Sequence, residues 1–190
     1  MSLEHILLGM LAEPASGYDL KAEFEAGARH FWFAELSQIY PTLRRMERRT
    51  WLTSQEEPSP SGPARRVYTR TRLGTAELLK WLRSGPVVGV ERFAYIGQLI
   101  FLGQLNDLET TLAFLERLRD LHREKLQFLK AAEKETSAKF AGDPDERDGV
   151  EFHEHLSLRM GIVSLGAKVR SCNECIKRVK DRMAAETSHV

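Results

Sequence analysis

Apolar residues recur at every third or fourth position through most of the chain, a spacing that predicts a mainly helical protein. The first stripe follows Ser2, which can cap a helix, and it stops at Pro14. Ser16 and Asp19 have the spacing of a capping box, which predicts a second helix that ends at Gly27. The apolar positions of these two helices are Leu3, Ile6, Leu7, Met10, Leu11, Leu20 and Phe24.

A third helix is predicted over residues 37–49, with Pro41 in its first turn, where a missing N–H is best tolerated. Its buried stripe is expected to be Ile39, Leu43 and Met46. The opposite face is expected to carry Gln38, Thr42, Arg45 and Arg49, flanked by Ser37, Arg44 and Arg48. An outward face of amide, hydroxyl and guanidinium groups suits a DNA groove.

The next segment predicts a β-hairpin and one more helix. Residues 51–53 and 65–70 have strand character, and the Pro-, Ser- and Gly-rich residues 56–63 predict a turn or flexible loop between them. Thr71 can cap a helix whose inner face would be Leu73, Ala76, Leu79 and Leu82. Because Gly85-Pro86 ends this helix, we expect one domain over residues 1–85 and a second over residues 86–190.

The order of elements in residues 1–85 is helix, helix, helix, hairpin, helix, which is the order of a winged helix-turn-helix. The second domain is almost purely helical, with helices predicted over residues 91–104, from Asn106 or Asp107 to about residue 140, and over residues 149–185. The predicted fold class is therefore mainly α with a small β-hairpin. An N-terminal winged helix-turn-helix is followed by a C-terminal dimerisation domain of antiparallel long helices.

The helices of the second domain carry more apolar surface than one chain can cover, since two antiparallel helices cannot bury these stripes fully by themselves. We expect a second copy of the chain to cover them, which also suits DNA half-sites related by two-fold symmetry. The stripes are Phe93, Ile96, Ile100, Phe101, Leu108, Leu112, Leu115, Leu118, Leu121, Leu126, Leu129, Phe152, Leu156, Met160, Val163, Val169, Ile176, Val179 and Met183.

Composition and charge narrow the class of protein. The 190 residues are 42% hydrophobic and 29% charged, with 28 Lys and Arg against 27 Asp and Glu, which excludes a bulk polycation and an intrinsically disordered chain. Positive charge is nevertheless gathered locally, since residues 36–72 hold eight arginines and three glutamates. The N-terminus has no signal-peptide pattern and no apolar run is long enough to cross a membrane, which predicts a cytoplasmic location.

Four short segments of the first 85 residues resemble the motifs of one known protein family. They are HILLGML at 5–11, SGYDL at 16–20, FW at 31–32 with SQIYPTLRRME at 37–47, and RRVYTRTRLG at 65–74. In this order they resemble the first helix, the second helix, the recognition segment and the wing strand of the PadR family of bacterial transcriptional regulators. The helical remainder resembles the subgroup with a long C-terminal dimerisation region.

The resemblance implies a dimeric DNA-binding repressor that is often relieved by a small molecule. In the family pattern the start of the third helix and the wing meet DNA, where Gln can read adenine and Arg can read guanine. Tyr68 has packing within the wing as its alternative role. With the neighbouring basic side chains, the predicted DNA contacts are Ser37, Gln38, Tyr40, Thr42, Arg44, Arg45, Arg48, Arg65, Arg66 and Tyr68.

Two positions depart from the family pattern. The family often has Gly-Leu after the recognition helix, where this chain has Thr50, Trp51 and Leu52. Because Gly adopts a positive φ most easily at a helix end, we expect this turn to differ. Three prolines, Pro58, Pro60 and Pro63, are expected to stiffen the tip of the wing.

Aromatic residues at the expected meeting point of the two domains suggest a site for a small-molecule effector. The predicted pocket is Phe31, Trp32, Phe33, Phe93 and Tyr95. Core or interface packing is the alternative interpretation of this cluster.

Sequence motifs for catalysis or metal binding are weak. Cys172 and Cys175 form a single CxxC in a helical segment, which we interpret as two reduced thiols, with a Cys₄ metal bridge across a dimer axis as the alternative. His153 and His155 are two residues apart and so point to different faces of a helix. No glycine-rich phosphate loop or nucleophile elbow is present. We therefore expect no enzyme activity, no cofactor and no metal.

The sequence thus predicts a homodimeric, sequence-specific DNA-binding transcriptional regulator, a repressor released by a small-molecule ligand. The alternative is a protein-interaction or scaffolding module that uses its helical dimer surface without binding DNA. Salt separates the two, because DNA binding weakens steeply with ionic strength whereas an apolar protein interface does not. The operator, the effector and the regulated genes do not follow from the sequence.

Overall fold

The computed structural model describes residues 3–26, 35–59, 62–88, 93–139, 142–143 and 149–187. The chain divides into two compact units, residues 1–90 and 91–190. Both are mainly helical, and the first also contains a three-stranded antiparallel sheet, so the predicted fold class is confirmed. Among the described residues, none of the helices combines the length and the apolar composition of a membrane span.

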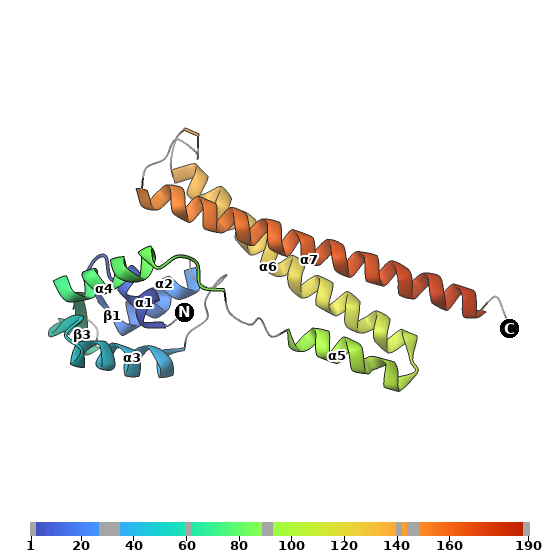
Figure 1. The fold of residues 1–190 in the computed structure, drawn as a ribbon, viewed down its shortest axis with the longest axis horizontal. Helices are drawn as coiled ribbons and strands as arrows, with labels where there is room; N and C mark the ends of the chain where they lie inside the picture. Colours follow the sequence, from blue (N-terminus) through green and yellow to red (C-terminus); the bar gives the residue numbers. More distant parts are fainter. Residues whose placement is uncertain are drawn as a thin grey trace. The chain divides into compact units, whose positions relative to one another are not determined.

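The described residues of the first unit form a small sheet and four helices (Figure 1). Its elements are α1 (Leu3–Met10), β1 (Ala15–Ser16), α2 (Gly17–Ala26), α3 (Leu36–Arg48), β2 (Leu52–Ser59), β3 (Gly62–Arg70) and α4 (Arg72–Arg83). Strand β3 lies in the centre, antiparallel to β1 on one side and to β2 on the other. The two-residue strand β1 was not predicted, because it is too short to show a periodicity.

The hairpin is longer than predicted. Strand β2 runs through Glu56 and Glu57, which were assigned to the loop, and these residues lie opposite Arg66 and Arg65 in β3. Opposite charges across an antiparallel pair favour the pairing, so a polar segment can extend a strand without any alternation of apolar residues. Of the loop predicted over residues 56–63, only residues 60–61 lie outside the described residues, whereas Pro58 lies in β2 and Pro63 in β3.

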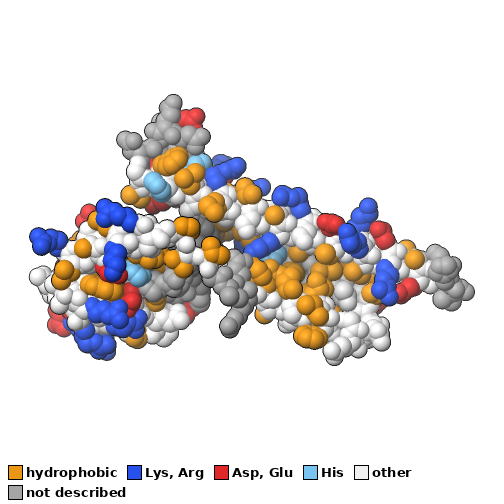
Figure 2. All heavy atoms as spheres, in the orientation of Figure 1, with side chains coloured by type: hydrophobic (Ala, Val, Ile, Leu, Met, Phe, Trp, Pro, Cys, Tyr) orange, Lys and Arg blue, Asp and Glu red, His pale blue; other side chains and the backbone are white. Residues whose placement is uncertain are grey.

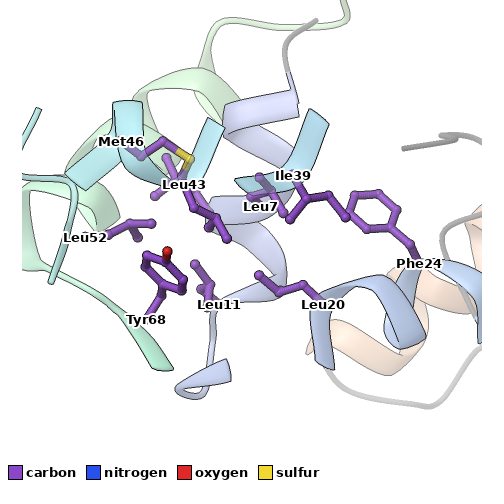
Figure 3. Packing of buried hydrophobic residues seen from close by; sticks show 10 residues of the cluster. Leu7, Leu11, Leu20, Phe24, Ile39, Leu43, Met46, Leu52 and Tyr68 are labelled. Atoms are coloured by element: carbon purple, nitrogen blue, oxygen red, sulfur yellow. The ribbon is translucent and has the colours of Figure 1, made fainter. Parts of the chain in front are cut away.

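The core of the first unit brings α1, α2, α3 and the sheet together (Figure 3). Side chains from segments far apart in sequence point toward one another there, and α3 contributes its predicted stripe. The buried members are Leu7, Leu8, Leu11, Leu20, Phe24, Ile39, Leu43, Met46, Leu52 and Tyr68. Burying a side chain of this size contributes about 1.5–3 kcal/mol, so this cluster anchors the orientation of α3.

Helix α4 begins as predicted but packs by a different face. The Thr71 hydroxyl accepts the Gly74 N–H at 3.1 Å and so caps the helix. Leu73, Leu79 and Leu82, expected on the inner face, are exposed. Residues spaced by three drift around a helix of 3.6 residues per turn, so that set does not form one face. Gly74 is buried instead, and a Cβ there would lie 2.3 Å from the Trp51 carbonyl oxygen.

The second unit consists of α5 (Ala94–Leu102), the 3₁₀ helix η2 (Gly103–Leu105), α6 (Leu108–Lys139) and α7 (Gly149–Thr187). Helices α6 and α7 form a long antiparallel pair (Figure 1). Asp107 caps α6 as predicted, because its carboxylate accepts the Thr110 N–H at 3.1 Å. Ion pairs join the helices at two levels, Glu116 to Lys180 at 3.2 Å and Glu133 to Arg159 at 3.4 Å.

One protomer leaves much of the second unit's apolar surface uncovered. No residue of α5 is buried, and Ile100 and Phe101 are 69% and 64% exposed. Figure 2 shows apolar side chains gathered on the surface of this unit. Three residues of the apolar stripe of α7 are exposed, as expected of a stripe that one chain cannot cover: Leu156, Met160 and Val163. A stripe with a strict heptad spacing drifts by about 20° per heptad on a straight helix, so one stripe cannot follow α6 along the whole length of α7.

Candidate nucleic-acid interface

The outward face of α3 is basic. Ser37, Pro41, Arg44 and Arg48 are exposed and follow one another at i, i+4, i+7 and i+11, opposite the buried stripe. Figure 2 shows Lys and Arg side chains gathered over this part of the first unit. Within the described part of the chain, neither Arg44 nor Arg48 forms an ion pair. Their guanidinium groups therefore keep all their N–H donors for a ligand.

The predicted outward face was wrong at Thr42, which is buried, and the exposed Arg45 on the same face contacts Glu4 of α1. Thr42 is 5% exposed, and its hydroxyl accepts a hydrogen bond from Arg45 at 3.3 Å. Arg45 Nε donates to Glu4 Oε1 at 2.6 Å, and Arg49 Nη1 reaches both Glu4 oxygens at 3.3 Å. Helical spacing defines a stripe, but it does not show which flank another helix covers.

Glu4 holds two arginines of α3 in place. Its side chain is only 12% exposed, whereas those of Arg45 and Arg49 are 44% and 50% exposed. A carboxylate removed from water needs charged partners and hydrogen bonds. The contact therefore joins α1 to α3 and leaves one positive charge in excess on this flank. Arg49 also lies over the Trp51 ring, 5.0 Å from its centroid.

Gln38, in the first turn of α3, takes part in capping that helix. The Gln38 amide oxygen accepts the Glu35 N–H at 3.2 Å, while the side chain stays exposed. Reading an adenine with two hydrogen bonds would need both the oxygen and the NH₂ group of Gln. With the capping bond in place, Gln38 can offer its NH₂ group alone.

The start of α2 supports the exposed Tyr40. A Cβ atom at Gly17 would lie 2.4 Å from Tyr40 Cε1, so the ring occupies the space that a larger residue at position 17 would need. The predicted capping box is present: Asp19 accepts the Ser16 N–H at 2.9 Å, and the Ser16 hydroxyl accepts the Asp19 N–H at 3.2 Å. The Ser16 N–H and the Ser16 hydroxyl both donate to the Asp19 carboxylate and lower its pKa, with the nearby Arg65 contributing.

The two wing arginines are held by carboxylates. Arg66 Nη2 lies 2.9 and 3.0 Å from the two Glu47 oxygens, and its Nε donates to Ser54 Oγ at 2.7 Å. Ser54 in turn donates to Glu47 at 2.6 Å. Arg65 is 3.3 Å from Glu57. Both guanidinium groups remain about half exposed, at 46% and 51%, so each can still donate to a phosphate.

Tyr68 was wrongly predicted to contact DNA, and its alternative role is right. It is 1% exposed and belongs to the core of the first unit. Burial raises the pKa of its hydroxyl. The Arg66 guanidinium carbon lies 5.8 Å from the centroid of its ring. The Tyr68 ring thus lies next to the guanidinium group of Arg66.

The turn after α3 contains a residue in the left-handed backbone conformation, and that residue is not Gly. Thr50 has φ 58°, so a β-branched residue adopts here the positive φ that Gly adopts most easily. The Thr50 N–H bonds to the Glu47 carbonyl at 2.8 Å and the Trp51 N–H to the Met46 carbonyl at 3.0 Å, the pattern of a Schellman motif. A β-branched residue in this conformation is strained.

The predicted effector pocket is only partly described. Phe31, Trp32 and Phe33 lie outside the described residues. Phe93 and Tyr95 belong to the second unit, where their ring centroids are 5.4 Å apart.

The cysteine pair shows two free thiols. Cys172 is buried, which raises its pKa, and Cys175 is half-buried. In the described segments, no group of three or more His, Cys, Asp or Glu side chains is placed to hold a metal ion. On α7, His153 Nδ1 lies 2.7 Å from the Gly149 carbonyl oxygen.

Comparison with known proteins places the chain in a family. Residues 6–80 match the Transcriptional regulator PadR-like family, and residues 99–180 match the family described as Virulence activator alpha C-term. The chain is 30% identical over 172 residues to the probable transcriptional regulator Rv1176c of Mycobacterium tuberculosis, covering 85% of this chain and 89% of the relative. The chain belongs to the PadR-like family of transcriptional regulators. The resemblance found in its sequence motifs is confirmed.

The PadR-like fold extends over nearly the whole chain. The negative transcriptional regulator PadR of Bacillus subtilis is 27% identical over 162 residues, covering 84% of this chain and 87% of that one. A structure of that PadR in complex with operator DNA has a TM-score of 0.80 at 22% identity, covering 93% of this chain and 97% of that chain. Another, with p-coumaric acid, has a TM-score of 0.72 at 22% identity, covering 94% of this chain and 95% of that chain. At these identities the structural likeness shows the fold.

Two acidic residues of this PadR-like protein were missed by the sequence analysis. Glu4 and Glu47 position three arginines, Arg45, Arg49 and Arg66. A signal was available in each case. Glu4 is a lone acid in the apolar first helix, and Glu47 interrupts the run RRMERR. An acid inside a basic or apolar segment indicates a paired charge, because an unpaired one would be unfavourable there.

Proposed function

We propose that this PadR-like protein is a homodimeric repressor that binds operator DNA and releases it when a small molecule binds. The observation that carries the proposal is the free face of α3, where Arg44 and Arg48 stand exposed beside Ser37 and Pro41 without an ion pair in the described residues. The Bacillus subtilis PadR that shares the fold has been solved both with operator DNA and with p-coumaric acid, which supports both halves of the proposal.

Residues 1–85 bind the DNA in this proposal. Helix α3 enters the major groove, where Arg44 and Arg48 read guanine or hold phosphate. Ser37 and Tyr40 at the start of α3 bind phosphate, and Gln38 reads a base with its NH₂ group. The paired arginines, Arg45, Arg65 and Arg66, add contacts from the flank and the wing.

Residues 86–190 form the dimer in this proposal. The exposed apolar residues of α5 and α7 supply the surface, and burying them against a second copy removes them from water. A two-fold axis then presents two α3 helices to two half-sites of the operator. As a regulator the chain has no enzyme activity, and it works in the cytoplasm, where the DNA is.

The proposal is tested by selecting bound sequences from random DNA with the full-length protein. Fluorescence anisotropy on the selected duplex and on a scrambled one, at three salt concentrations, then measures affinity. We expect the affinity for the selected duplex to fall by about 10³-fold or more between about 50 and 200 mM salt, given about six neutralised phosphates. Equal binding to both duplexes, or a flat salt dependence, contradicts the proposal.

Single substitutions show which part of the surface binds. Arg44→Ala and Arg48→Ala should each weaken binding by roughly tenfold or more, as expected when a good base or phosphate contact is lost. Arg178→Ala removes the same charge from an exposed position of α7 and serves as the matched control. If the control weakens binding as much as the α3 variants, the DNA surface is wrongly placed.

Substitutions of Gln38 and Arg66 should change DNA binding in different ways. Gln38→Ala should relax sequence preference at one or two base positions at a cost of about 1–3 kcal/mol. Arg66→Ala should weaken all DNA sequences alike and lower the salt slope by about one unit per half-site. If Arg66→Ala relaxes the sequence preference and Gln38→Ala only lowers the salt slope, the wing and not α3 contacts the bases.

A further inference from the structure

An acid of α3 lies beside the free basic face of that helix. Glu47 follows Arg44 by three residues, so the two side chains are neighbours on the helix surface. The carboxylate of Glu47 contacts the wing, where both of its oxygens accept hydrogen bonds from Arg66 Nη2, at 2.9 and 3.0 Å. Ser54 of β2 donates to Glu47 at 2.6 Å and accepts from Arg66 Nε at 2.7 Å. Side chains from α3, β2 and β3 thus form one closed hydrogen-bond network.

A second acid is available to Arg66 within the hairpin. Glu56 lies directly opposite Arg66 in the pairing of β2 with β3, and opposite residues of an antiparallel pair share one face of the sheet. The guanidinium group nevertheless bonds to Glu47, which is 19 residues away in the sequence. An ion pair inside the hairpin would stabilise the hairpin alone, whereas the observed ion pair joins the wing to α3.

The network leaves one edge of the Arg66 guanidinium group free. The N–H of Nε bonds to Ser54, Nη2 bonds to Glu47, and the Tyr68 ring lies 5.8 Å from the guanidinium carbon. Within the described residues no hydrogen bond involves Nη1, and the Arg66 side chain is 46% exposed. Because the guanidinium group is planar and rigid, the other contacts fix the direction of the Nη1 hydrogens, which stay available to a phosphate.

We propose that Glu47 is a positioning residue for DNA binding: by holding Arg66 it strengthens the binding of DNA, although its own charge repels phosphate. A side chain that is already fixed in its binding orientation loses less conformational freedom when the complex forms. Glu47 and Ser54 act through Arg66 and do not themselves contact the DNA. The inference rests on the proposed function, because it concerns the phosphate contact assigned there to the wing.

The sign of the effect separates positioning from charge. Removing an acid makes the DNA-binding surface more positive, so charge alone predicts that Glu47→Gln tightens binding. The positioning role predicts weaker binding, because the guanidinium group of Arg66 loses its anchor. Ser54→Ala removes a member of the same network without any change of charge, so positioning predicts weaker binding there too, and charge predicts no effect.

The test measures fluorescence anisotropy of the selected duplex with the full-length protein. Glu47→Gln should weaken binding by about tenfold or more, since each of the two half-sites loses one anchored arginine. Ser54→Ala should weaken it by about threefold or more for the same reason. The scrambled duplex should be weakened alike, because Arg66 contacts phosphate. Unchanged or tighter binding by Glu47→Gln overturns the proposal.

Glu56→Gln is the matched control. It removes the same charge from an exposed position of the wing, opposite Arg66, where the described residues include no ion pair of Glu56. Binding should stay within about twofold of the wild type or become tighter, as expected when only charge changes. If Glu56→Gln weakens binding as much as Glu47→Gln does, the contact between α3 and the wing is not responsible and the proposal is overturned.

A double-mutant cycle shows whether Glu47 acts through Arg66. In a chain that already carries Arg66→Ala, adding Glu47→Gln should not weaken binding further, because no guanidinium group is left to hold. A loss of full size without Arg66 means that Glu47 acts on α3 itself, and it overturns the proposal. If circular dichroism shows that Glu47→Gln does not fold, Ser54→Ala, alone and combined with Arg66→Ala, decides in the same way.

The wild-type titration separates failure of this inference from failure of the proposed function. If the wild type does not prefer the selected duplex to the scrambled one, the proposed function falls and the inference falls with it. If the wild type has this preference and Glu47→Gln binds equally well or better, the proposed function stands and the inference alone is overturned.

Discussion

In the first unit, side chains from three helices and the sheet close into one buried cluster, and its six leucines are each at most 2% exposed. In the second unit, α5 has nine residues, mostly apolar, and buries none of them within one protomer. The two units differ in what completes them. The first contains all the residues of its own core, whereas the second presents an apolar surface that a second copy of the chain is expected to cover.

This difference has a thermodynamic consequence. A unit with a complete core has a free energy of unfolding that does not depend on protein concentration. A unit completed by a partner is stabilised by mass action, so its apparent stability rises with concentration. Substitutions in the two units should therefore differ in their dependence on concentration as well as in size.

The largest effect is expected from charges placed on α5. The double change Ile100→Glu with Phe101→Glu should give a monomer at micromolar concentration, because carboxylates would have to be buried at the dimer surface. Operator affinity should then fall by about 10²–10⁴-fold, since binding of two linked half-sites is lost. Sedimentation and anisotropy measure the two effects.

A matched control for that change lies in the first unit. Leu82 of α4 is 59% exposed, comparable to Ile100 and Phe101. Leu82→Glu should leave the chain dimeric. A double α5 variant that stays dimeric would show that α5 is not at the interface.

The next largest effect is expected in the closed core. Leu43→Ala should lower the free energy of unfolding by about 2–5 kcal/mol, through lost burial and the cavity left behind. The fall in Tm should be the same at low and high protein concentration. Calorimetry over a hundredfold range of concentration checks this, and a strong concentration dependence would mean that the first unit also relies on a partner.

A smaller effect is expected at the contact between α1 and α3. Glu4→Gln should lower the free energy of unfolding by about 1–2 kcal/mol, because two hydrogen-bonded ion pairs weaken while the arginines can still reach water. Urea denaturation measures the change. Glu13→Gln, at an exposed position, makes the same change of charge as a control, and an equal loss there would show that overall charge and not the contact is responsible.

The smallest effect is expected in the pH dependence of the second unit. Burial and the nearby lysines lower the pKa of His122 in the folded chain below its unfolded value. The unfolded chain therefore binds more protons, and the free energy of unfolding falls as the pH drops below about 6.5. Denaturation at about pH 7.5 and 5.5 should show less difference for His122→Phe than for the wild type. His153→Gln, on the exposed side of α7, should retain it.

Local signals in the sequence predicted most of the elements correctly. The caps at Ser16, Thr71 and Asp107 were found because a cap depends on residues three positions away. The buried stripe of α3 was predicted correctly, but the flank with Thr42 and Arg45 was not, because it depends on Glu4, which is 41 residues from Arg45. The sequence predicted that the apolar stripes of α6 and α7 would stay partly uncovered, but not which residues would be exposed, since that depends on how two long helices cross. Spacing predicts which residues share a face, and only the packing of other elements decides which face is covered.

The contact between Gly17 and Tyr40 restricts the order in which this surface can change during evolution. With Tyr40 present, any side chain at position 17 collides with its ring, because the Cβ would lie 2.4 Å from Cε1. Once Tyr40 is replaced by a smaller residue, alanine at position 17 becomes acceptable and favours the helix, since Ala has the higher helix propensity. The same substitution is thus harmful in one background and harmless in the other. A lineage that first replaces Tyr40 by a smaller residue can then adopt sequences of α2 that a lineage retaining Tyr40 cannot.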